Sequence, residues 1–132
     1  MAKTSWIFSL LLLLSLGACS SGEKPETTLI PEVVHELLGP SEFASILSQT
    51  NKFLLLDIRT PDEYETGHLK GAINLNFFDP GFHDSLQQLD KQLPVFIYSQ
   101  NGTRSNKALT ALKGSGFLKI YELEGGYEGM AL

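Results

Sequence analysis

The sequence predicts an α/β fold, with an open, mostly parallel sheet of about five strands flanked by helices. Three observations lead to this prediction. Short apolar runs alternate with amphipathic stretches along the chain. The run at 53–58 is apolar at consecutive positions, which is typical of a parallel strand covered on both faces. The 132 residues leave room for one such domain.

The first half of the domain is expected to hold three strands and one clear helix. Residues 33–38 form the first strand, before Gly39-Pro40. Ser41 is expected to cap a helix whose inner face carries Phe43, Ile46 and Leu47. Residues 53–58 form the second strand and 72–75 a weaker third one.

The second half is expected to hold the best helix of the chain. Phe82, Leu86 and Leu89 make a short helical stripe, and Pro94 precedes a fourth strand at 95–98. An amphipathic helix follows at 103–113, ended by Gly114 and Gly116. Residues 118–123 form the fifth strand, before a turn at Gly125-Gly126. Ligands of such sheets bind beyond the carboxyl ends of the strands, so we expect the site at loop 99–104.

The N-terminal segment is predicted to direct the chain to a membrane. Lys3 precedes an apolar run at 6–16, which as a helix would span only about 16 Å, half of a bilayer core. Leu16-Gly17-Ala18-Cys19 resembles the bacterial lipobox. That resemblance implies a signal peptide at 1–18 and a lipid on Cys19. Ordinary secretion with a coincidental cysteine is the alternative.

The lipobox resemblance, together with the polar composition of the segment after Cys19, predicts the organisation of the mature chain. Residues 19–31 would be the lipidated N-terminus and a solvated tether, and 32–132 the folded domain. We expect the protein in the bacterial cell envelope. Ser20 follows the cysteine, and we take the periplasmic side of the outer membrane as the default placement.

Composition excludes several classes of function. The formal net charge of −5, from 10 Lys+Arg against 15 Asp+Glu, argues against a nucleic-acid partner. Cys19 is the only cysteine, which rules out an intrachain disulfide, a Cys-x-x-Cys pair and a cysteine-based zinc site. No cofactor and no metal are expected.

Four segments in order resemble the rhodanese-homology family, whose active members transfer sulfur. They are Leu56-Asp57-Ile58-Arg59 with Glu63-Tyr64, then 67–74 (GHLKGAIN), 98–105 (YSQNGTRS) and 124–127 (EGGY). The resemblance covers roughly residues 33–130. It implies structural roles for Asp57, Arg59, His68 and Gly71. Asp57 and Arg59 would brace the loop after the second strand, through Glu63 or Glu65. His35 and His83 match no motif and are predicted to be surface residues.

The resemblance also points to loop 99–104. In the family, a cysteine at the position of Ser99 lies in a nest of backbone N–H groups and carries sulfur as a persulfide. A hydroxyl is far less acidic than a thiol, and oxygen cannot hold that sulfur. No catalytic residue is therefore expected. The loop would remain as an anion cradle with Arg104 as its positive wall, formed by Ser99, Gln100, Asn101, Gly102, Thr103 and Arg104.

Several functions stay open on this sequence. The leading hypothesis is a membrane-anchored, non-catalytic module that binds a small anion or a protein partner. The inherited loop could equally bind nothing in particular. The alternatives are a sulfurtransferase with residual or unusual activity, a phosphatase using the same kind of loop, and a purely structural envelope lipoprotein.

Overall fold

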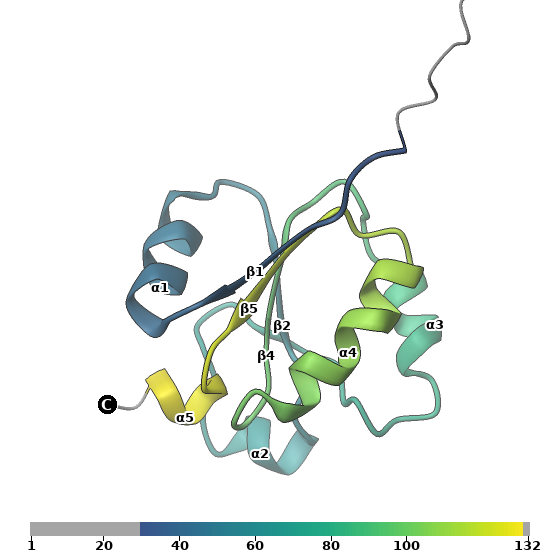
Figure 1. Ribbon diagram of the computed structural model, residues 1–132. Coiled ribbons are helices and arrows are strands. Elements are labelled where there is room, and N and C mark those ends of the chain that lie inside the picture. Colours follow the sequence, from purple (N-terminus) through teal and green to yellow (C-terminus); the bar gives the residue numbers. More distant parts are fainter. Residues whose placement is uncertain (1–29, 131–132) are drawn as a thin grey trace, which may run out of the picture.

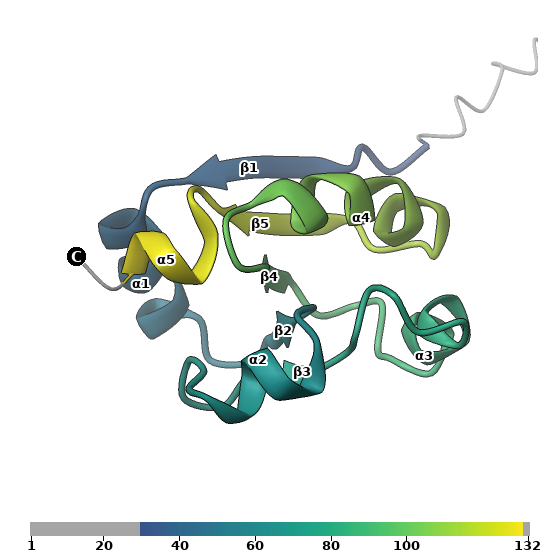
Figure 2. The same ribbon diagram turned by 90° about the horizontal axis from the view of Figure 1, so that it is seen from below.

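The computed structural model describes residues 30–130 and confirms the predicted α/β fold. The expected signal peptide and Cys19 lie outside these residues. Five parallel strands form one sheet in the order β1-β5-β4-β2-β3 (Figures 1 and 2). The elements are β1 (Val34–Leu38), α1 (Pro40–Gln49), β2 (Leu54–Asp57), α2 (Pro61–Glu65), β3 (Ile73–Asn74), α3 (Phe82–Gln87), β4 (Val95–Tyr98), α4 (Thr103–Gly114), β5 (Lys119–Leu123) and α5 (Gly126–Met130).

Helices cover both faces of the sheet, which is why its central strands are apolar without alternation. Figure 2 shows α1 and α5 on one side of the sheet and α4 and α3 on the other. One core cluster packs under α3 and α4, around Leu56, Ile97 and Leu112. The second packs under α1, around Phe43, Phe96 and Leu123. Alternate residues of β4 and β5 contribute to opposite cores.

Two local predictions need correction. Ser41 does not cap α1, because the helix already begins at Pro40 and Gly39 is the N-cap residue. Proline suits the first helical position, since its fixed φ is helical and its missing N–H would have no partner there. The third strand is shorter than 72–75 and comprises only Ile73 and Asn74.

The parallel arrangement brings the candidate site to one edge of the sheet. β2 and β4 run in register, so that Asp57 lies beside Tyr98 at their carboxyl ends. The loop that follows β4 therefore lies next to the segment that follows β2 (Figure 1). Within residues 30–130, no helix is both long and apolar enough to cross a bilayer.

Candidate functional site

Ser99 lies at the centre of the loop between β4 and α4, with its hydroxyl turned inward. The residue is 0% exposed. Its Oγ accepts the backbone N–H groups of Gly102 and Ser105, each at 3.2 Å. It also lies 3.4 Å from the Ser105 hydroxyl. The hydroxyl thus fills part of the backbone nest itself, and it is not presented to solvent.

The loop backbone bends at Gly102 and is held in place by α5. Gly102 adopts a φ of +89°, which favours glycine and ends the tight turn before α4. The carbonyl oxygens of Ser99 and Gln100 accept the N–H groups of Tyr127 and Glu128 at 2.8 and 3.0 Å. These backbone hydrogen bonds attach the loop to α5 independently of the loop's side chains.

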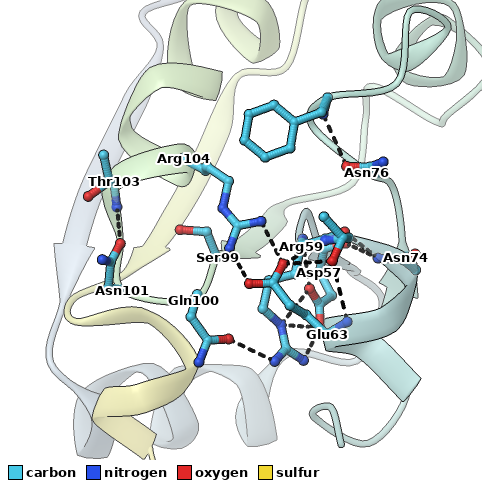
Figure 3. Close-up of polar contacts among 12 residues, drawn as sticks. Asp57, Arg59, Glu63, Asn74, Asn76, Ser99, Gln100, Asn101, Thr103 and Arg104 are labelled. Carbon is cyan, nitrogen blue, oxygen red and sulfur yellow. Dashed lines mark hydrogen bonds and ion pairs between the residues drawn. The ribbon is translucent and has the colours of Figure 1, made fainter. Parts of the chain in front are cut away.

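Arg104 reaches out of the loop to Glu63 at the start of α2. Its two terminal nitrogens donate to the two oxygens of Glu63, each at 2.7 Å (Figure 3). The hydrogen bond from Arg104 lowers the pKa of Glu63 to about 2. Glu63 also completes a capping box with Thr60. The positive charge of Arg104, which was expected to form one wall of the anion cradle, is therefore balanced by the Glu63 carboxylate.

Asp57 and Arg59 form a second, fully buried pair below the loop. The Arg59 Nη2 atom lies 2.7 Å from the Asp57 carboxylate, and both side chains are almost completely inaccessible. Arg59 also donates to Gln100 Oε1 at 3.1 Å and to the carbonyl oxygen of Gly67. It thus ties the loops after β2 and β4 together, through Gln100 and Gly67 rather than through Glu63 or Glu65.

The remaining motif residues and the unassigned histidines lie around this frame. His68 is exposed, stacks on Tyr64 with ring centroids 3.7 Å apart, and contacts the Tyr64 carbonyl at 3.0 Å. Gly71 adopts a φ of +84° before β3. His83 is exposed on α3. His35 is not a simple surface residue, because its Nε2 lies 3.0 Å from Oε2 of the buried Glu122. Sequence reasoning missed this contact, because the two residues are 87 positions apart.

Two hollows flank the loop. The first has a volume of about 530 Å³ and carries the ring of Phe78, which is 64% exposed. The second, of about 410 Å³, lies on the β1 side of the loop and includes Leu37, Glu122 and Glu124. Within residues 30–130, no cluster of three or more His, Cys, Asp or Glu could hold a metal ion. The first hollow is lined by Thr60, Glu63, Phe77, Phe78, Gln100, Asn101, Thr103, Arg104 and Lys107.

Comparisons with known proteins identify related sequences. A model of the rhodanese-like domain matches residues 39–132. The thiosulfate sulfurtransferase GlpE of Ectopseudomonas mendocina is 32% identical over 94 residues, which cover 67% of this chain and 84% of the relative. YqhL, described as an uncharacterized protein, of Bacillus subtilis is 38% identical over 77 residues, covering 58% of this chain and 60% of the relative.

Other relatives are matched over a smaller share of their length. The tRNA uridine(34) hydroxylase of Aster yellows witches'-broom phytoplasma is 39% identical over 93 residues, which cover 67% of this chain but only 30% of that enzyme. Among solved structures, a rhodanese-like domain protein from Staphylococcus aureus superposes with a TM-score of 0.63 at 22% identity, over 72% of this chain and 90% of the other. A likeness at that identity concerns the fold alone.

Proposed function

This chain belongs to the rhodanese-like domain family, and on that premise we propose that it is a membrane-anchored, non-catalytic module that binds a protein partner beside its loop. The observation that carries the proposal is Ser99. It occupies the position at which the family's nucleophilic cysteine would stand. Its hydroxyl oxygen already accepts hydrogen bonds from two backbone N–H groups. A serine nucleophile needs a positioned base, and the side-chain contact of Ser99 is to another serine, Ser105.

The charges around the loop favour a protein over a small anion as the ligand. Arg104 is paired with Glu63, and Arg59 with Asp57. A free anion would have to compete with carboxylates that already hold both guanidinium groups. The first hollow instead offers an exposed aromatic ring at Phe78, with the Arg104 guanidinium 5.6 Å from its centre. Phenylalanine and arginine are both enriched in protein interfaces relative to the rest of the surface.

The direct test is sulfur transfer by the full-length chain. We expect no thiosulfate:cyanide turnover above that of a reaction without protein. In a Cys19→Ser background, Ser99→Cys then provides a single thiol in the loop, which should take up one sulfur atom from thiosulfate. Ser115→Cys, in the same background, is a matched control with a buried thiol at the end of α4. Turnover by the native chain that Arg104→Ala abolishes would overturn the proposal.

Partner binding needs its own test. A photo-reactive amino acid placed at Phe78 in the membrane-bound protein should give one discrete cross-linked product in intact cells. The same group at Lys52, an exposed residue between α1 and β2, should not. If position 78 gives no product, or both positions give the same one, the domain is better described as a structural envelope lipoprotein.

One observation favours a sulfurtransferase as the second candidate. One of the sequence relatives, of which this chain covers 84%, is named as a thiosulfate sulfurtransferase. A sulfurtransferase would have to transfer sulfur without using Ser99, because the serine oxygen cannot carry the transferred sulfur atom. The turnover measurement on the native chain separates the two functions.

A further inference from the structure

Glu122 places a carboxylate in the interior, directly behind the loop. It lies in β5, is 1% exposed, and is the neighbour of Ile97 in the sheet. Its Oε1 accepts the hydroxyl of Ser105 at 2.9 Å. The function proposed above makes no use of this residue. A buried carboxylate is costly unless it is well hydrogen-bonded, so its presence calls for a physical explanation.

A short chain of contacts links Glu122 to the position of the missing nucleophile. Ser105 Oγ lies between the Glu122 carboxylate and the Ser99 hydroxyl, at 2.9 and 3.4 Å. The Glu122 carboxylate is thus no more than about 6 Å from Ser99 Oγ. At that distance, with an effective dielectric constant near 20, two like charges repel by an amount equivalent to about two pKa units.

Three other cations lie near the loop, and one of them, Lys107, is exposed and lines the second hollow together with Glu122. Arg104 and Arg59 are each neutralised by their own carboxylate, Glu63 and Asp57. His35 contacts Glu122 from β1, but through Oε2, the oxygen that does not face Ser105. The imidazole therefore contacts the carboxylate oxygen that does not contact Ser105.

We propose that Glu122 is the specificity-determining residue of the loop, because its buried negative charge disfavours an anion in the nest around Ser99. The proposal goes beyond the loss of the cysteine, because it assigns a second and separate obstacle to sulfur chemistry. It rests on the proposed function only in taking the loop to be a binding surface. It also predicts that restoring the thiol restores its reactivity only in part.

The test measures the acidity of a thiol introduced at Ser99. In the full-length chain with Cys19→Ser, Ser99→Cys is compared with Ser99→Cys/Glu122→Gln by following thiolate absorbance against pH. Glutamine keeps the shape of glutamate and one of its two acceptor oxygens, and it removes the charge. We expect the thiol pKa of the double variant to be lower than that of Ser99→Cys alone by about one to two units. Glu124→Gln, an exposed neighbour on the same strand end, is the matched control and should shift it far less.

A second measurement uses the native serine. Sulfate, titrated by NMR, should bind the Glu122→Gln chain at least about tenfold more tightly than the native chain, a difference equivalent to one pKa unit. Should the glutamine variant fail to fold, Glu122→Met removes the same charge with an apolar residue of similar length. Equal thiol pKa values together with equal sulfate affinities would overturn the assignment of Glu122. Turnover by the native chain would overturn only the proposed function.

Discussion

Replacing Arg104 should destabilise the domain in a manner that depends on pH. The Arg104→Met variant removes the charge that pairs with Glu63 and keeps an apolar side chain of similar reach. The pKa of Glu63 falls from 4.5 to about 2 in the folded chain. Taken in full, that shift corresponds to about 3.4 kcal/mol. The Glu63 side chain is 32% exposed, so solvent screening reduces the expected loss to about 1–2 kcal/mol near neutral pH.

The sign of the pH dependence follows from the lowered pKa. A carboxyl group whose pKa is depressed by folding stabilises the folded state above its unfolded pKa. This stabilisation is lost as the pH falls from about 4.5 to about 2, because Glu63 then becomes protonated. The difference in unfolding free energy between the native chain and Arg104→Met should therefore shrink over that range.

Urea denaturation followed by circular dichroism at several pH values measures this difference. Lys107→Met, on the same helix and exposed, is the control that removes a charge without an ion pair. A difference that stays constant from neutral to acid pH, or that is equally large for Lys107→Met, would refute the role given to the pair.

Three further results are expected. Asp57→Asn leaves the buried guanidinium of Arg59 without its counter-charge and should cost about 3–5 kcal/mol of unfolding free energy in urea. Gly126→Ala places a methyl group against the loop backbone at a residue with a φ of +60°, and it should lower the free energy of unfolding by at least about 2 kcal/mol. Its control is Gly114→Ala, whose methyl group meets nothing within 4 Å and should leave the free energy of unfolding unchanged or slightly raised. Burial raises the pKa of Tyr98, so in an alkaline absorbance titration this phenol should ionise only as the protein unfolds.

Local patterns were sufficient to predict the sheet and the position of the loop. The apolar runs before Asp57 and Ser99 identified β2 and β4, because a strand covered on both faces carries little polar sequence. The predicted start of α1 differs from the observed one because a serine and a proline both favour a helix start there. A serine is a common cap, but the proline before it already fits the first turn of the helix.

The contacts that decide the chemistry of the site could not be predicted in the same way. Arg104 and Glu63 are 41 positions apart, and His35 and Glu122 are 87 positions apart. Spacing along the chain carries no information on such pairs until the strand order is known. In β5, Glu122 interrupts an apolar run, and a charged residue at a buried strand position is the one signal that could have indicated it.

The common direction of the five strands has a consequence for orientation. The chain enters β1 at the amino edge of the sheet, and Ser99 lies at the carboxyl edge, so a strand's length of roughly 17 Å separates the two poles of the domain. Under the proposed anchoring, the pole nearer the lipid would be the one that carries the tether. The loop would then lie at the pole opposite the tether, so that the tether would not obstruct a large partner that approaches the loop.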